Sequence, residues 1–284
     1  MQYKNILVAI NIYEDYHHTL QTAERLAQKF GSKLTAMMVL NAPFELIPMA
    51  TEYQKSLEEQ VITTLNREIE RLDLKSVKTI TETGAPHNKI TGYSNDHDID
   101  LIVLGSHGTH GLNLLLGSTS NSVLHQAPCD VLTVRLGENK PESATLYNRV
   151  LLATDMDIDN HQLVDKAKIL AEKYEGSFSV VNVQADPTVA VSTFGVVPAI
   201  HKELHKASQE QLTQWCQEQG LNVENNCIMG ESSQAITEHA KDNGYNLIIV
   251  GSHHRSAIGR FFLGSTANAT LHHSDTDVLV VRLK

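Results

Sequence analysis

The chain repeats itself. Asp100–His107 (DLIVLGSH) recurs as Asn246–His253 (NLIIVGSH), and Asp130–Leu136 (DVLTVRL) recurs as Asp277–Leu283 (DVLVVRL). Half of the 284 residues is an ordinary size for one domain. Because a repeated pattern of apolar and polar residues specifies the same core twice, we expect two copies of one domain. The expected ranges are 1–138 for the first domain, 139–147 for a polar linker and 148–284 for the second domain.

Within each copy, short aliphatic runs alternate with longer amphipathic stretches. This alternation predicts βα units and a parallel sheet that is buried on both faces. In the first copy we expect strands near 5–11, 34–40, 77–82, 100–104 and 130–136, and helices near 16–30, 51–73, 86–96 and 117–126. In the second copy we expect helices near 160–175, 198–219, 232–243 and 264–273. Gly31 stands where the glycine that ends a helix belongs, and Gly176 is interpreted as its repeat. The predicted fold class is α/β, with two tandem, doubly wound, five-stranded parallel-sheet domains of Rossmann-like type.

Composition and charge exclude several classes of protein. The formal net charge of −10 disfavours binding to nucleic-acid backbones. The longest aliphatic runs are far shorter than the roughly 18 residues that a transmembrane helix needs, so we expect no membrane protein. The N-terminus enters a strand-like run directly, without the features of a secretory signal. Cys129, Cys216 and Cys227 have neither disulfide nor zinc spacing, as expected for a cytosolic protein.

A glycine-rich segment follows the fourth predicted strand in each copy. Doubly wound sheets bind ligands where the strand order reverses, which places the expected sites near Asn11 and Gly105, and near Asp155 and Gly251. Gly117–Thr119 and its repeat begin helices, where unpaired backbone amides and the helix dipole favour phosphate. For either loop alone, a turn followed by an ordinary helix N-cap is the alternative interpretation. The occurrence of the loop at a strand end in both copies favours a phosphate site.

These motifs resemble those of the universal stress protein family, and the resemblance to its tandem two-domain members extends over essentially the whole chain. The family motif is G-x2-G-x9-G-S/T, which binds the phosphates of ATP in the nucleotide-binding branch of the family. The resemblance implies an adenine nucleotide alpha hydrolase-like fold, with nucleoside contacts from an acidic residue that ends strand one and from the backbone of a strand-two valine. ATP or a related adenine nucleotide is the implied ligand, with Mg²⁺ as its companion ion. Carried over to this chain, the site residues are Asn11, Val39, Gly105, Gly108, Gly117, Ser118 and Thr119 in the first copy, and Asp155, Val183, Gly251, Gly264, Ser265 and Thr266 in the second.

Both copies depart from the family motif. The first has eight residues instead of nine between Gly108 and Gly117, and it has Asn11 where the family has an acidic residue. An amide can replace a carboxylate as a hydrogen-bonding group, but it loses the charge-assisted part of the bond. The second copy keeps Asp155 and the nine-residue spacing, but His254 replaces the second glycine, where a side chain would crowd the phosphate path. We therefore expect two sites that are not equivalent.

The chain has no recognisable catalytic constellation. It lacks a G-x-S-x-G elbow, a Walker lysine after Gly117 and an H-E-x-x-H motif, and its loop histidines have no companion ligands at metal-binding spacing. The leading hypothesis is a cytoplasmic stress-response protein that binds ATP or a related adenine nucleotide as a sensor or adaptor. The alternatives are a stress scaffold whose sites have lapsed, and a weak ATPase. In the resembled family the last strand pairs across a two-fold axis, so we expect the two domains to pair intramolecularly through their last strands, with a homodimer as a further option.

Overall fold

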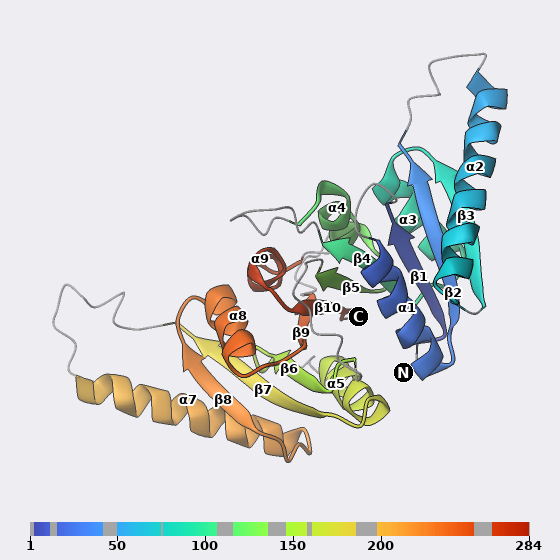
Figure 1. The fold of residues 1–284 in the computed structure, drawn as a ribbon. Coiled ribbons are helices and arrows are strands. Elements are labelled where there is room, and N and C mark those ends of the chain that lie inside the picture. The colour runs from blue at the N-terminus through green and yellow to red at the C-terminus, as the bar shows by residue number, and fades with distance from the viewer. Residues whose placement is uncertain are drawn as a thin grey trace. The chain divides into compact units, whose positions relative to one another are not determined.

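The chain forms two compact units that divide between Glu142 and Ser143. The computed structural model describes residues 3–11, 16–41, 50–74, 76–106, 116–135, 146–157, 161–185, 198–252 and 263–283. Each unit contains one copy of the sequence repeat, and the two units are called the first repeat and the second repeat. In Figure 1 the first repeat runs from blue to green and the second from yellow-green to red.

The first repeat is a parallel sheet with helices on both faces. Its described elements, in chain order, are β1 (Asn5–Ile10), α1 (His17–Phe30), β2 (Lys33–Leu40), α2 (Ala50–Arg71), β3 (Val77–Thr83), α3 (Pro86–Asp96), β4 (Leu101–Ser106), α4 (Ser118–Gln126) and β5 (Asp130–Arg135). The strands lie in the order β3-β2-β1-β4-β5. Right-handed crossovers place α1 and α2 on one face and α3 and α4 on the other, and α3 packs against α4.

The second repeat has the same topology. Its described elements are β6 (Arg149–Ala153), α5 (His161–Lys173), β7 (Ser177–Gln184), α7 (Pro198–Glu218), β8 (Asn225–Met229), α8 (Ser232–Asp242), β9 (Leu247–Ser252), α9 (Ser265–His273) and β10 (Asp277–Arg282). The strands lie in the order β8-β7-β6-β9-β10, and α8 packs against α9. The predicted fold class is therefore confirmed in both repeats.

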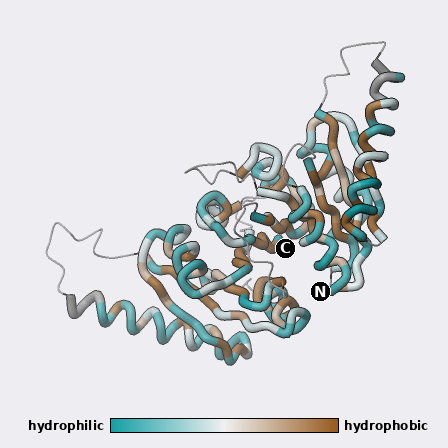
Figure 2. The backbone as a smooth tube through the Cα atoms, in the orientation of Figure 1, coloured by the Kyte–Doolittle hydropathy of each residue, from teal (hydrophilic) through white to brown (hydrophobic). Residues whose placement is uncertain are grey.

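Burial of the strands explains why the aliphatic runs form the centre of each repeat. Ile6 of β1 is in register with Leu34 of β2 and Leu101 of β4, and all three side chains are buried. Figure 2 shows hydrophobic residues concentrated along the strands. Most observed element ends lie within two residues of the predicted ones, and α4 and α9 each begin one residue later than predicted, at Ser118 and Ser265.

One of the two predicted helix-ending glycines has a different role. Gly31 ends α1 in the left-handed conformation, with φ of 69°, as predicted. In the second repeat it is Glu175 that takes this conformation, with φ of 51°, so the interpretation of Gly176 as the repeat of Gly31 is wrong. Gly176 is required instead by close approach of the backbone, because a Cβ there would lie 2.3 Å from the carbonyl oxygen of Asn148. The two chain segments can meet only where one of them has no side chain.

A buried tyrosine–aspartate hydrogen bond occurs in both repeats. The Tyr3 hydroxyl donates to Oδ2 of Asp130 at 2.8 Å, and the Tyr147 hydroxyl donates to Oδ2 of Asp277 at 2.8 Å. Both pairs are buried and join residues more than 120 positions apart. Burial and the neighbouring Asp130 carboxylate raise the pKa of Tyr3 well above its ordinary value. Each pair ties the start of its repeat to the first residue of its last strand.

The raised pKa of Tyr3 predicts a loss of stability at alkaline pH. In the unfolded chain a tyrosine ionises near pH ~10, whereas folded Tyr3 keeps its proton to higher pH. Above about pH 10 the folded state therefore binds more protons, and the free energy of unfolding falls by up to about 1.4 kcal/mol per pH unit. Urea unfolding between about pH 8 and about pH 11 should show a smaller fall for Tyr3→Phe than for the wild type, while Tyr93→Phe serves as a half-buried control. Equal slopes in Tyr3→Phe and the wild type would contradict this assignment.

The remaining sequence-based expectations concern membrane spans, the cysteines and the pairing of the repeats. Within the residues that the structure describes, no helix is both long and apolar enough to cross a bilayer. Cys129, Cys216 and Cys227 are free thiols, and burial raises the pKa of Cys216 to about 11. Pairing between the two last strands, and a homodimer, stay predictions.

Candidate functional site

The strand order reverses beside the central strand of each repeat. In the first repeat β1 lies between β2 and β4, and in the second β6 lies between β7 and β9. The chain therefore winds outward in opposite directions from this point, which is where doubly wound sheets place a ligand crevice, at the carboxyl ends of the strands. Among the described residues, the predicted Asn11, Val39, Gly105, Asp155, Val183 and Gly251 lie at or just after these strand ends, and Gly117–Thr119 and Gly264–Thr266 lie at the starts of α4 and α9.

In the second repeat this crevice is a cavity of about 510 Å³, within the range of small-molecule sites. It is lined by the ends of β6, β7 and β9 and by residues of α5, α8 and α9. All of the second-repeat residues predicted from the sequence line it: Asp155, Val183, Gly251, Gly264, Ser265 and Thr266. The fold thus brings residues separated by more than 100 positions to one cavity.

The helices α8 and α9 both direct their N-termini to this cavity, but their capping differs. The carboxylate of Glu231 caps α8 by accepting hydrogen bonds from the amides of Ser233 and Gln234, at 3.2 and 2.9 Å. The Ser233 hydroxyl also donates to this carboxylate. This bond has the largest effect, and together with the two amide bonds it lowers the pKa of Glu231. The N-cap of α9 is Gly264, which offers no side-chain cap. The first-turn amides of α9 are therefore available to an external acceptor.

The conformation of Gly264 supports a role in binding. Its φ of −58° and ψ of 151° are accessible to any residue, and Gly117 of the first repeat has nearly the same values. The backbone dihedral angles therefore do not require glycine at either position. The absence of a side chain instead opens the helix N-terminus, next to the hydroxyl-bearing residues Ser265 and Thr266. This arrangement suits an anion such as phosphate.

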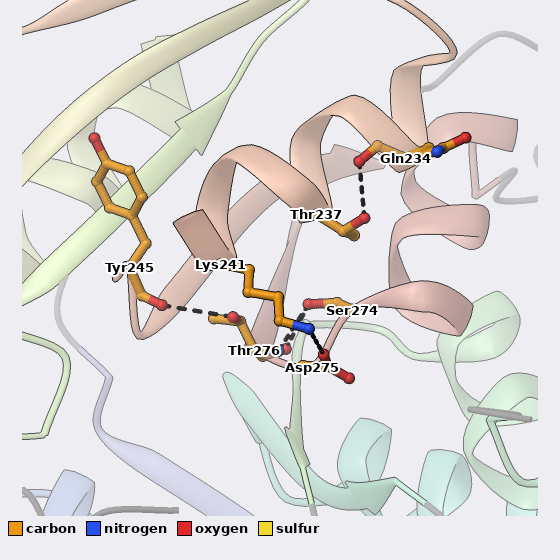
Figure 3. Close-up of polar contacts among 7 residues, drawn as sticks. All are labelled: Gln234, Thr237, Lys241, Tyr245, Ser274, Asp275 and Thr276. Atoms are coloured by element: carbon orange, nitrogen blue, oxygen red, sulfur yellow. Dashed lines mark hydrogen bonds and ion pairs between the residues drawn. The ribbon is translucent and has the colours of Figure 1, made fainter. Parts of the chain in front are cut away.

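Contacts at the opposite ends of α8 and α9 hold the two helices in place (Figure 3). Lys241 of α8 forms an ion pair with Asp275 at 3.3 Å, just beyond the end of α9. The Ser274 hydroxyl donates to the carbonyl of Thr276 at 2.8 Å, and the Thr276 hydroxyl donates to the carbonyl of Tyr245 at 3.5 Å. These contacts lie at the carboxyl ends of α8 and α9, opposite the N-termini that line the cavity.

The backbone of Val183 faces the cavity at the end of β7. On the β8 side, the amide of Gly230 donates to the carbonyl of Gln184 at 3.0 Å. On the β6 side, the amide of Thr154 donates to the carbonyl of Val181 at 3.0 Å. Since backbone groups alternate between the two neighbouring strands, the N–H and C=O of Val183 point to the β6 side, where β6 has already ended. A donor and an acceptor are thus presented side by side.

Asp155 lies between the helix end and the Val183 end of the cavity. It directly follows Thr154, which ends the pairing of β6 with β7, and its side chain is exposed at the cavity wall. Its Oδ1 accepts a hydrogen bond from the amide of Asp157 at 3.2 Å, and the Thr154 hydroxyl accepts one from the amide of Met156 at 2.9 Å. These short turns hold the carboxylate at the strand end.

The first repeat places its predicted residues at the corresponding positions. Asn11 is exposed directly after β1. Val39 is half-buried and is the second-to-last residue of β2. The carbonyl of Gly105 accepts a hydrogen bond from the Ser120 hydroxyl at 3.1 Å, which links β4 to α4. Gly117 is the N-cap of α4, and Ser118 and Thr119 form its first turn.

Gly108 and His254 lie outside the described residues, so the predictions about the eight-residue spacing and about His254 stay predictions.

Several cavity residues were missed by sequence reasoning. The polar residues among them are Thr154, Asn182, Gln184 and Ser232. A signal was present in the comparison of the two copies, because Asn182 and Gln184 correspond to Met38 and Leu40 of the first repeat. There the two apolar side chains pack with Val61 in a buried cluster. A polar pair that replaces an apolar pair at buried strand positions indicates a local function.

The fold and the cavity define a class of protein: tandem, doubly wound α/β domains with an uncapped helix N-terminus at the point where the strand order reverses. The chain belongs to the universal stress protein family, whose family model matches residues 2–135 and 146–282. The predicted family and its tandem arrangement are thereby confirmed.

The chain is also similar to individual proteins and solved structures. Universal stress protein A homolog 2 of Coxiella burnetii is 32% identical over 142 residues, which cover 47% of this chain and 96% of the relative. The crystal structure of a universal stress protein from Archaeoglobus fulgidus has the same fold, with a TM-score of 0.71, 20% identity and 99% of each chain covered. A universal stress protein solved in complex with cAMP is matched over 49% of this chain and 98% of that chain, at 21% identity and a TM-score of 0.34.

Proposed function

We propose that this universal stress protein binds ATP or a related adenine nucleotide in the cavity of its second repeat and acts in the cytoplasm as a nucleotide-responsive sensor or adaptor. The observation that carries the proposal is the meeting of three kinds of group in one cavity. These are the uncapped N-terminus of α9, the carboxylate of Asp155 and the unpaired backbone edge of Val183. They complement a phosphate, a ribose hydroxyl and the edge of a base, respectively.

The spacing of these groups supports the proposal. Gly251 and Val183 lie in the last two residues of β9 and β7, and Asp155 lies two residues after the end of β6, which is the strand between them. Adjacent strands lie about 4.8 Å apart, so the cavity extends roughly 10 Å from the phosphate end to the base end. That is about the reach of a nucleoside from its 5′ oxygen to the far edge of its base. An anion belongs at the helix end, and a flat uncharged ring belongs beside Val183 and Ile236.

Nucleotide binding can be tested on the purified full-length protein. Heat denaturation should release any bound small molecule for mass spectrometry, and calorimetry of nucleotide-free protein with ATP, with and without Mg²⁺, should show saturable binding. If no nucleotide is released and millimolar ATP gives no heat of binding, the proposal is wrong. A scaffold whose sites have lapsed would then be the better description.

The charge of Asp155 should contribute to affinity. Asp155→Asn introduces the residue type found at Asn11 of the first repeat, and we expect the affinity for ATP to fall about fivefold because the charge-assisted hydrogen bond is lost. Calorimetry of the two variants Asp155→Asn and Asp157→Asn makes the comparison, since Asp157 is exposed nearby but does not line the cavity. A change of less than twofold for Asp155→Asn, or equal changes for both variants, would exclude this role.

A further inference from the structure

Two side-chain amides form a hydrogen-bonded relay at the base end of the second-repeat cavity. Nδ2 of Asn182 donates to the backbone carbonyl of Thr154 at 2.8 Å, and Nε2 of Gln184 donates to Oδ1 of Asn182 at 2.6 Å. Asn182 is buried, with 3% of its surface exposed, and Gln184 is half-buried. Both residues line the cavity.

The chemistry of the relay fixes the orientation of both amides. A backbone carbonyl can only accept a hydrogen bond, so the end of Asn182 that meets Thr154 must be its NH₂ group. Its oxygen must then face Gln184, which meets it with NH₂. The thiol of Cys227 also donates to this oxygen, with a sulfur–oxygen distance of 3.9 Å, and burial raises the pKa of Cys227, so the thiol keeps its proton. Reversing either amide would leave a buried oxygen facing another oxygen.

The relay leaves the side-chain oxygen of Gln184 and the second N–H of its Nε2, and the oxygen is the acceptor that it offers to a ligand. Among the residues that the structure describes, this Oε1 has no hydrogen-bond partner. The backbone of Val183, which lines the same cavity, offers one donor and one acceptor, and such a pair can bind either an amino-substituted or an oxo-substituted ring edge. An acceptor held in the same cavity favours the amino-substituted edge, because it accepts from an amino group and repels a carbonyl oxygen.

The first repeat has no counterpart of the relay. The corresponding residues, Met38 and Leu40, are 2% and 8% exposed and pack with Val61 and Leu57. A methionine and a leucine offer no oriented hydrogen-bonding group to a ligand. The two repeats therefore differ at the base end of their sites as well as at Asn11 and Asp155.

We propose that Asn182 and Gln184 make the second-repeat cavity selective for purines that carry a 6-amino group over purines that carry a 6-oxo group. Gln184 is the residue that meets the ligand, and Asn182 is a positioning residue that holds Gln184 in its acceptor orientation. The proposal rests on the nucleotide-binding function proposed above and adds the chemical basis of selectivity. The first repeat lacks this selectivity.

The experiment compares ATP with inosine triphosphate, which differs at the purine by a carbonyl in place of the 6-amino group. All proteins carry Gly117→Val, so that binding at the first repeat is removed and the second cavity is measured alone. Without a further substitution, the protein should bind ATP at least about tenfold more tightly than inosine triphosphate. Gln184→Leu, which introduces the residue type of Leu40, should bring the ratio of affinities to within about threefold, chiefly by weakening ATP binding.

Two internal controls separate selectivity from folding. Gln234→Leu makes the same chemical change on a glutamine of α8 (Figure 3). Gln234 is exposed and does not line the cavity, so the ATP preference of this variant should match that of the Gly117→Val parent. Retained binding of inosine triphosphate by Gln184→Leu shows that the variant is folded and keeps its phosphate site. Asn182→Leu should lower the ATP preference as Gln184→Leu does, because Gln184 is then free to turn its amino group to the ligand.

The outcomes distinguish this inference from the proposed function. Equal affinities for the two triphosphates in the parent, or a ratio unchanged by Gln184→Leu, overturn the relay and leave nucleotide binding in place. Binding of neither triphosphate by the parent or by the wild type overturns nucleotide binding, and the selectivity proposal with it. A tenfold preference that Gln184→Leu removes and Gln234→Leu keeps supports both.

Discussion

Gly176→Ala should lower the free energy of unfolding of the second repeat by about 3 kcal/mol. The added Cβ would lie 2.3 Å from the carbonyl oxygen and 2.6 Å from the Cα of Asn148, and both are backbone atoms that no side-chain rotation can move away. The amide of Ser177 donates to that same carbonyl at 2.9 Å, so a shift of Asn148 would also strain the start of β7. Urea unfolding followed by circular dichroism measures the effect.

A matched substitution separates this contact from a general effect of alanine. Gly92 lies inside α3, and a Cβ there would meet nothing within 4 Å. Gly92→Ala should therefore stabilise the first repeat by about 0.5–1 kcal/mol, because alanine is the better helix former. If Gly176→Ala is as stable as the wild type, the backbone near Asn148 yields easily, and close approach is not the reason for this glycine.

Gly264→Asp should have opposite effects on stability and on nucleotide binding. The backbone at this position suits any residue, and aspartate is a better N-cap than glycine, so the free energy of unfolding should rise by a few tenths of a kcal/mol. The same carboxylate would stand where the proposed phosphate binds. Like charges in contact cost several kcal/mol, so the affinity for ATP should fall about 100-fold or more. Thermal unfolding and calorimetry on one preparation measure the two effects.

Gly264→Asn is the control for the charge. Asparagine caps a helix about as well as aspartate and has nearly the same shape, so its effect on stability should be similar. Its loss of ATP affinity should be clearly smaller than that of Gly264→Asp, since only crowding remains. A Gly264→Asp variant that binds ATP normally would show that the N-terminus of α9 does not hold the phosphate. Unequal stabilities of the two variants would instead argue against a simple capping effect.

Much of the fold was predictable because its signals are local. The aliphatic runs of β1 and β4 predict strands, and the amphipathic spacing of the helical segments predicts helices. The second copy of the repeat shows each pattern again and so supports the same assignment. The predicted helix at 86–96 coincides with α3. The different role of Gly176 was not predictable, because a glycine after a helix looks the same in the sequence whether it allows a positive φ or avoids a clash.

The candidate site was predictable in position and incompletely predictable in composition. Asp155, Val183 and Gly264 could be placed at one edge of the sheet, because the carboxyl ends of parallel strands always meet there. Asn182 and Gln184 were not predicted as site residues, because the sequence of a β-strand does not show which distant backbone carbonyl a buried amide will meet.

The sequence by itself determined the two repeated domains, their α/β class, the family, and the strand ends at which a ligand site belongs. These properties follow from hydrophobic periodicity and glycine spacing, which are read along the chain. Only the tertiary structure decided that α8 is capped by Glu231 while α9 is left uncapped, that Gly176 makes room for Asn148, and that Thr154 orients Asn182 and through it Gln184. The contacts of Gly176 and Asn182 depend on the distance and direction between groups on separate elements, which are set only when the chain packs, whereas the two caps depend on the local conformation at the start of each helix.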